Sequence, residues 1–196
     1  MLKGVKIKNM ITSVEVAFLI DFVRKESAGC MFEIGEYIVY GSKGVCQVED
    51  ISHVDIPGAN KDRLYYVLRQ HEGGSGKIYV PTDNDKIVMR KVITKEAAED
   101  LIRRMPEIEQ MWVDNDKQRE AMYKETMRTC DYNEWVSMIK ALYFRKRERT
   151  AQGKKVTALD EKYLKAAENE LYSELGLILG IPKAEVVAYI KEKIGI

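Results

Sequence analysis

Between Met31 and about residue 91, apolar and polar positions alternate with the two-residue period of β-strands. The first stretch, MFEIGEYIVYGSKGVCQVEDI, is rich in valine, isoleucine and tyrosine, which favour strands. The pattern predicts five strands, near residues 34–40, 44–54, 64–70, 76–81 and 86–90. Turn-forming stretches separate them at residues 41–44, 55–62, 71–76 and 81–85. Because closure protects sheet edges, we expect a small SH3-like or Tudor-like β barrel.

From Thr94 onward, the apolar positions follow the helical period. The stretch TKEAAEDLIRRM has Thr94 as its N-cap candidate and ends before Pro106, so it predicts one helix. A second helix is expected over residues 113–129. The third helix is predicted to bury one apolar face, which is formed by Trp135, Met138, Ile139, Leu142 and Tyr143.

The C-terminal part of the chain predicts two more helices. Thr157 and Asp160 form a capping box, with aspartate in place of the usual glutamate, and open a long helix. Gly180 fits the position that follows a helix. Pro182 fits the first turn of the last helix, which is expected to end near Lys193.

These elements predict an α+β chain. An N-terminal β barrel, residues 31–92, is expected to precede an all-α C-terminal domain, residues 93–196. Residues 1–30 share little with either pattern, and we expect them to form an extension or a flexible or helical arm. Their apolar stretch ITSVEVAFLIDFV is interrupted by Glu15 and Asp21, so we expect neither a signal peptide nor a membrane span.

The formal charge of the 196-residue chain is only +1, but its charges are unevenly distributed. Residues 96–135 carry 6 Lys and Arg against 11 Asp and Glu, whereas residues 136–165 carry 9 against 3. The basic excess is densest in RKRERTAQGKK, residues 145–155. Such a cluster favours contact with phosphates over a merely solvated helix end whose cations complement the helix dipole.

Catalytic and metal-binding chemistry finds little support in the sequence. Cys30, Cys46 and Cys130 form no CxxC pair, and the two histidines lack the spacing of metal ligands. GGSGK, residues 73–77, lacks the flanking residues and the following helix of a phosphate loop, so it predicts a hairpin turn. No GxSxG or HExxH motif occurs. We expect a reduced, cytoplasmic, non-enzymatic protein without a metal, cofactor or small-molecule substrate.

Trp112 stands in EQMWVDNDKQRE, just ahead of a charged helix with few apolar neighbours. Two interpretations stay open at this point: the side chain covers a small helical core, or it is held out for a partner. Trp135 differs, because its apolar stripe predicts a core position.

Several of these segments together resemble the CarD/CdnL family of bacterial transcription regulators. The resemblance rests on MFEIGEYIVYGSKGVCQVEDI, the later YYVL and IYVPTDN, a tryptophan before a helix, and RKRER followed by KVTALDEKYLKAAENEL. It covers about residues 31–180 and depends on the order and spacing of the segments. The first domain is also similar to the RNA polymerase-interacting domain of the transcription-repair coupling factor, whose helicase motifs this sequence lacks.

The resemblance implies two binding surfaces. The barrel would add its edge to a sheet of the RNA polymerase β subunit through Ile78, Tyr79, Val80 and Pro81. The helical domain would bind promoter DNA at the upstream edge of the melted −10 region, where Trp112 would act as a minor-groove wedge that stabilises the open complex. Basic residues would contact the DNA: Lys117, Arg119, Arg145, Lys146, Arg147, Arg149, Lys154 and Lys155.

We therefore expect a monomeric transcription regulator whose preferential binding shifts polymerase from the closed to the open complex. The alternative from another class is a protein-only adaptor, in which the barrel binds a partner and the basic residues are merely solvated. The resemblance also implies a start equivalent to Met31, so residues 1–30 would be an upstream extension from a start-site choice or an additional arm.

Overall fold

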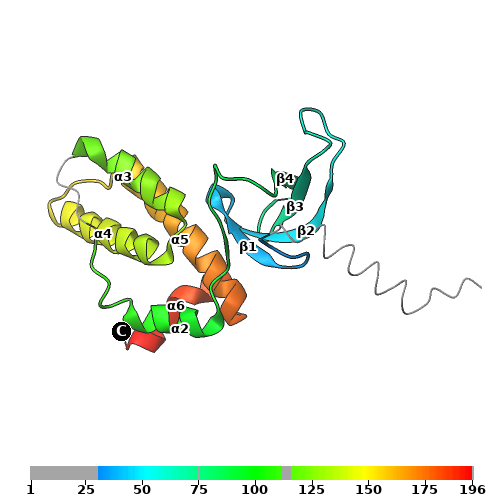
Figure 1. Cartoon of the computed structure of the whole chain (residues 1–196). Helices are drawn as coiled ribbons and strands as arrows, with labels where there is room; N and C mark the ends of the chain where they lie inside the picture. Colours follow the sequence, from blue (N-terminus) through cyan, green and yellow to red (C-terminus); the bar gives the residue numbers. More distant parts are fainter. Residues whose placement is uncertain (1–30, 75, 112–115, 196) are drawn as a thin grey trace, which may run out of the picture. The chain divides into compact units, whose positions relative to one another are not determined.

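The computed structural model describes residues 31–74, 76–111 and 116–195. The contacts divide the chain into two units, Met1–Met31 and Phe32–Ile196. In the second unit the strands come first and the helices follow (Figure 1). The predicted α+β class is therefore confirmed, whereas the expectations for residues 1–30 lie outside the described residues.

The sheet of the second unit is antiparallel and open. Its strands have the order β4-β3-β2-β1-β5. Because β4 and β5 lie at opposite ends of this order and do not pair within the described residues, the predicted closure into a barrel is not confirmed. The predicted strand positions are confirmed, although the first and last strands are shorter than expected: β1 (Tyr37–Tyr40), β2 (Val45–His53), β3 (Leu64–Gln70), β4 (Lys77–Pro81) and β5 (Met89–Lys91).

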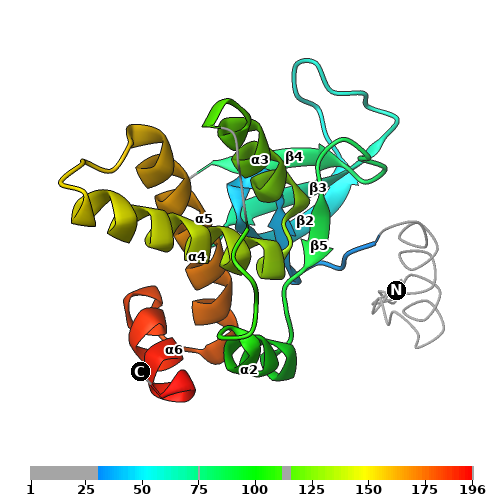
Figure 2. The ribbon, with the colours of Figure 1, turned by 90° about the vertical axis from the view of Figure 1, so that its left-hand side faces the viewer.

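The helices begin where the period of the sequence changes. Thr94 caps the first of them, since its hydroxyl oxygen accepts a hydrogen bond from the Ala97 amide at 3.2 Å. Gly180 ends the longest helix, as predicted, and adopts the left-handed conformation with φ of 68°. The bounds are α2 (Lys95–Arg104), α3 (Asp116–Thr129), α4 (Tyr132–Ala151), α5 (Ala158–Leu179) and α6 (Val186–Ile194), with the short 3-10 helices η2 (Gly41–Lys43) and η3 (Lys183–Glu185). Helices α4 and α5 pack side by side, and α2 and α6 pack against each other and against α5 (Figure 2).

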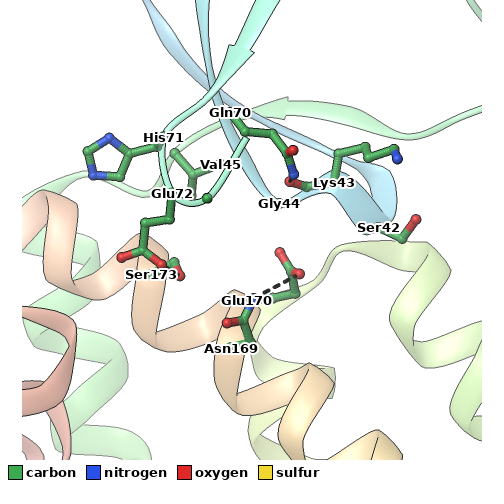
Figure 3. Close-up of a pocket in the computed structure, with 11 residues that line it drawn as sticks. Ser42, Lys43, Gly44, Val45, Gln70, His71, Glu72, Asn169, Glu170 and Ser173 are labelled. Atoms are coloured by element: carbon green, nitrogen blue, oxygen red, sulfur yellow. Dashed lines mark hydrogen bonds between the residues drawn. The ribbon is translucent and has the colours of Figure 1, made fainter. Parts of the chain in front are cut away.

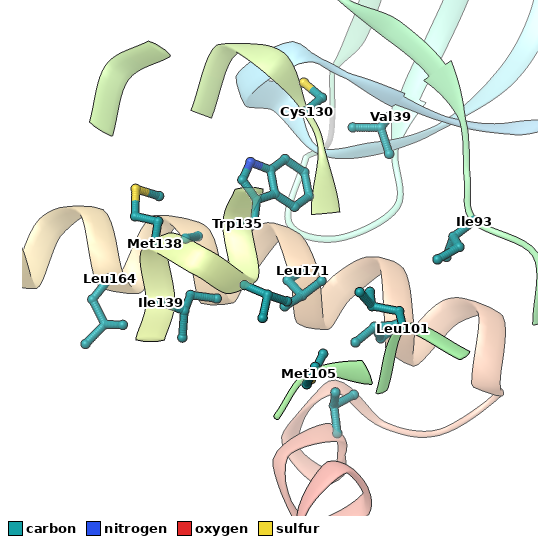
Figure 4. Close-up of a cluster of buried hydrophobic side chains, with 14 of the residues drawn as sticks. Val39, Ile93, Leu101, Met105, Cys130, Trp135, Met138, Ile139, Leu164 and Leu171 are labelled. Atoms are coloured by element: carbon teal, nitrogen blue, oxygen red, sulfur yellow. The ribbon is translucent and has the colours of Figure 1, made fainter. Parts of the chain in front are cut away.

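The predicted apolar face of α4 forms the centre of the helical core (Figure 4). Trp135 is 1% exposed, and Met138, Ile139 and Leu142 are buried beside it. The prediction for Tyr143 is wrong, because its side chain is 47% exposed. Tyr143 lies at the margin of the stripe, where its hydroxyl donates a hydrogen bond to Glu168 at 2.5 Å.

The capping box predicted at the start of α5 is only half present. The Thr157 hydroxyl accepts a hydrogen bond from the Asp160 amide at 3.1 Å, as expected. The Asp160 carboxylate is directed away from the cap. It is 1% exposed, and it accepts hydrogen bonds from Arg145 Nε at 2.9 Å and from the Tyr123 hydroxyl at 3.3 Å. Asp160 therefore stabilises the packing of α3, α4 and α5.

A buried ion pair joins the sheet to the helices. Arg90 of β5 donates two parallel hydrogen bonds to the carboxylate of Glu174 on α5, at 2.6 and 2.8 Å. The same guanidinium donates to the Cys130 carbonyl at 2.6 Å and lies 5.6 Å from the centre of the Trp135 ring. Glu174 is 1% exposed and also accepts a hydrogen bond from the Ile93 amide at 2.8 Å. The Arg90–Glu174 pair therefore stabilises the packing of β5 against α4 and α5.

No helix within residues 31–74, 76–111 and 116–195 combines the length and the apolar character required to cross a bilayer.

Candidate functional site

Strand β4 lies at one end of the sheet and pairs with β3 alone among the described strands. The Thr82 amide donates to the Leu64 carbonyl at 3.0 Å, directly beyond the last pair of the ladder. In an antiparallel ladder only alternate residues direct their backbone groups to the neighbouring strand. The backbone groups of Val80 and Ile78 therefore face β3, whereas those of Lys77 and Tyr79 lie on the outer edge. The Pro81 carbonyl accepts a hydrogen bond from the Asn84 amide at 3.0 Å. Proline has no N–H, so Tyr79 supplies both a donor and an acceptor at the centre of this edge.

The side chains of β4 alternate between core and surface. Val80 is buried and helps to hold the strand on the sheet, while Ile78 and Pro81 are half-buried. Tyr79 is 37% exposed on the other face. The four residues predicted to contact a polymerase thus form one edge strand that has a buried anchor and an accessible aromatic ring, an arrangement suited to pairing with a partner strand.

The opposite end of the sheet has a different environment. Arg90 of β5 donates a hydrogen bond to the Lys91 carbonyl at 3.1 Å, in addition to its bonds with Glu174 and Cys130. These contacts fix β5 against the helices. Among the two end strands, β4 is the one whose edge suits strand addition.

Most of the predicted basic residues lie on the surface near the end of α4 and the loop after it. Lys146, Arg147, Lys154 and Lys155 are exposed and form no ion pair with a described residue. Arg149 is half-buried, and its Nε donates to the Lys155 carbonyl at 2.8 Å, which orders the loop. We refer to the four exposed residues as the basic cluster. Their positive charge is available to a partner.

Two of the residues predicted to contact DNA lie within the helical packing. Arg145 is paired with Asp160, and their side chains are 26% and 2% exposed. Arg119 on α3 is 5% exposed. Burial and, second, the Asp160 carboxylate raise the pKa of the nearby Tyr123 hydroxyl. The positive charge of Arg119 opposes this shift. Arg145 thus offsets the buried charge of Asp160, and Arg119 is buried within the packing, which a count of cations along the sequence does not reveal.

Exposed aromatic rings adjoin the basic cluster. Phe144 is 40% exposed, and Tyr143 is also accessible. Tyr143 and Phe144 both lie within about one helical turn of Lys146 and Arg147 on α4, so the rings and the cations occupy adjacent parts of the helix surface. Aromatic rings next to cations are typical of surfaces that bind unstacked bases. The sequence LYFRKR contains this signal, but the apolar stripe predicts a core position for Tyr143.

Trp112 lies outside the described residues, as does the side chain of Lys117. The segment that leads to Trp112 is held firmly against α4. Lys140 donates its ammonium protons to the carbonyls of Met105 and Pro106, both at 3.1 Å, and also to that of Ile108. Ser137 donates to the Glu109 carbonyl at 2.7 Å and accepts, through its own carbonyl, the Met111 amide at 3.3 Å. This anchoring set was missed from the sequence, because a lysine within a helix gives no sign that it caps a distant loop.

The titratable groups that could suggest catalysis have structural contacts. His53 Nδ1 lies 2.9 Å from the Lys61 carbonyl, and the His71 ring packs edge-on against Tyr37. Cys46 and Cys130 are buried thiols. Burial raises the pKa of Cys46 to about 11, with a further contribution from Glu170, so its thiol is neutral at pH 7. Within the described parts of the chain, no group of three or more His, Cys, Asp or Glu side chains is arranged to hold a metal ion.

Residues 32–93 match the family model described as the CarD-like/TRCF RID domain. No curated protein matches the chain. The matched segment contains all five strands of the sheet, including β4, and supports an RNA polymerase-interacting role. The helices from α2 onward lie outside the match.

Proposed function

We propose that this protein is a non-enzymatic, cytoplasmic transcription regulator that acts as a monomer on RNA polymerase and promoter DNA. The observation that carries the proposal is the edge of β4 within a CarD-like/TRCF RID domain. The partner is the polymerase β subunit, whose sheet would be extended by β4. Backbone hydrogen bonds at Tyr79 would hold the two strands together, and the exposed Tyr79 ring would add side-chain contact.

The helical part is proposed to bind promoter DNA through the basic cluster and the neighbouring aromatic rings. The cations would neutralise phosphates, which gives attraction without sequence preference. Phe144 and Tyr143 suit contact with bases at the edge of a melted region. Because Arg145 and Arg119 are committed to the helical packing, the phosphate contacts are proposed to come mainly from the exposed cations.

Replacing Lys146, Arg147, Lys154 and Lys155 by glutamine is expected to reduce the salt dependence of DNA binding. Each lost phosphate contact lowers the log–log slope by about 0.9, so the four changes together should remove roughly 3–4 from its magnitude. Fluorescence anisotropy on duplex DNA across a salt series measures the slope.

The same variant separates the proposal from the protein-only adaptor. A matched control replaces Lys95 and Lys191, which lie on other helices, by glutamine. An unchanged slope in the four-residue variant, together with unchanged regulation, would favour the adaptor. Loss of DNA affinity in that variant alone supports direct contact.

The proposed mechanism is a population shift. Trp112 would insert beside the melted −10 region and offset the unstacking free energy of a few kcal/mol per step. The anchored segment before it, held by Lys140 and Ser137, would limit the entropy lost on insertion. Preferential binding to the open complex then raises its population relative to the closed complex.

Trp112→Ala is expected to shorten the lifetime of the open complex by about tenfold, if the wedge contributes roughly 1.4 kcal/mol. Competitor-challenge kinetics on a promoter fragment measures this lifetime. Binding of the variant to isolated polymerase should be unchanged, since β4 is untouched. A lifetime equal to that with the unsubstituted protein would remove Trp112 from the mechanism.

A further inference from the structure

A polar cavity of about 310 Å³ lies where the sheet meets α5 (Figure 3). The turns after β1 and β3 form one wall, and α5 forms the other. Its volume is within the range of small-molecule sites in proteins. None of the residues proposed above to contact polymerase or DNA lines it.

The carboxylate of Glu170 projects from α5 into this cavity (Figure 3). Glu170 is only 9% exposed. Its Oε1 accepts one long hydrogen bond, 3.4 Å, from the Asn169 side chain, and no described residue donates to Oε2. Buried carboxylates in proteins are normally paired with a cation or several donors. The observed contact is weak for such a group.

Gly44 leaves the space that this carboxylate occupies. A side chain at position 44 would collide with Glu170 Oε2, and the φ of 69° at Gly44 independently favours glycine. The Glu170 oxygen therefore sits directly beside the backbone of the turn between β1 and β2. Glycine at this position therefore lets the carboxylate lie against the turn that lines the cavity.

The other polar groups around the cavity also leave oxygens unused. Glu72 Oε2 accepts from Ser173 at 2.7 Å and from Lys183 at 2.8 Å, and no described residue donates to its Oε1. Gln70 donates its amide N–H to the Lys43 carbonyl at 2.8 Å, which leaves its side-chain oxygen as an acceptor. These three acceptors, on Glu170, Glu72 and Gln70, call for a ligand that carries several donors. An ammonium group, with three N–H donors and a positive charge, meets this requirement.

We propose that this cavity binds the ammonium group of a small alkylamine, with Glu170 as its counter-ion and with Glu72 and Gln70 as additional acceptors. The short alkyl chain would extend toward the opening of the cavity. Lys183 is already bonded to Glu72 and to Asn169 at 2.8 and 2.5 Å. Lys43 lines the cavity, but its exposed side chain is directed away from the Glu170 carboxylate (Figure 3), so neither lysine supplies this cation. The site is separate from the proposed polymerase and DNA contacts.

Neighbouring carboxylates add negative charge around Glu170. Burial raises the pKa of Glu170, the Asn169 hydrogen bond and Lys183 lower it, and the carboxylates of Glu174 and Glu72 raise it further. Lys43, His71 and Cys46 are the other titratable groups on the facing elements. An ammonium ligand binds the ionised carboxylate, so binding releases a proton and strengthens as pH rises through the raised pKa.

Titration with butylamine at constant ionic strength tests the proposal. The amide resonances of Gly44 and Gly73, both at the cavity, report binding in ¹H–¹⁵N spectra. The unsubstituted protein should show saturable shifts at these two glycines, while butan-1-ol, which has the same shape without the charge, should not produce them. Glu170→Gln removes the charge with little change of size, and it should weaken butylamine binding by about tenfold or more.

The expected result is a ranking in which Glu170→Gln binds most weakly, Glu72→Gln is intermediate and the unsubstituted protein binds best. Glu72→Gln also provides the test if Glu170→Gln fails to fold. The proposal is overturned if Gly44 and Gly73 do not respond at any point of the titration at constant pH and ionic strength. It is equally overturned if butan-1-ol gives the same shifts, or if the folded variants bind butylamine as well as the unsubstituted protein.

Discussion

Arg90→Met is expected to lower the free energy of unfolding by roughly 3–5 kcal/mol. The substitution removes the partner of Glu174, which is 1% exposed, and leaves a negative charge without its cation inside the protein. It also removes the hydrogen bond to the Cys130 carbonyl and the cation beside the Trp135 ring. Urea unfolding followed by circular dichroism measures the change.

Arg128→Met is the matched control for this prediction. Arg128 is paired with Glu125 on α3 at 2.7 Å, but both side chains are exposed, so solvent screens the pair. The control should therefore unfold at nearly the same urea concentration as the unsubstituted protein. An Arg90→Met midpoint as high as that of the control would show that the Arg90–Glu174 pair does not hold the sheet and the helices together.

Tyr79→Pro is expected to weaken binding to RNA polymerase by at least about tenfold while leaving the fold intact. The Tyr79 N–H is directed away from β3, so proline at this edge position breaks no hydrogen bond of the sheet. It removes the donor that would pair with the polymerase strand, and its ring obstructs close approach. Surface plasmon resonance with immobilised core polymerase measures the affinity, and thermal unfolding verifies the fold.

Tyr79→Ala separates the backbone from the side chain. Alanine retains the N–H and removes the ring, which is 37% exposed. Pairing through the backbone predicts a smaller loss of affinity for Tyr79→Ala than for Tyr79→Pro. Equal losses would assign the binding to the tyrosine ring, and no loss in either variant would exclude this edge of β4 as the polymerase contact.

Local patterns in the sequence were sufficient to place most of the elements. Alternation located the strands, and the helix ends at Thr94 and Gly180 follow from capping chemistry that acts within a few residues. The edge position of β4 could not be read in this way, because strand order depends on contacts between distant segments. The resemblance of the sequence to a family supplied that expectation.

The charged residues show where sequence patterns stop being informative. The run from Arg145 to Lys155 appears uniform in sequence, yet Arg145 neutralises a buried aspartate while Arg147 is exposed. Asp160 was assigned to a cap because its tertiary partners are 15 and 37 residues away along the chain. The setting of Glu170 is not evident from local sequence for the same reason, since the turn that meets it lies in the sheet.

Hydrogen–deuterium exchange at the Tyr79 amide, with and without RNA polymerase, tests the central claim most directly. In the protein alone this amide faces outward from the sheet, so it should exchange rapidly, while the inward-facing amides of Ile78 and Val80 should be protected. Addition of polymerase should slow exchange at Tyr79. Bound polymerase that leaves the Tyr79 amide exchanging at its original rate would contradict strand pairing at β4.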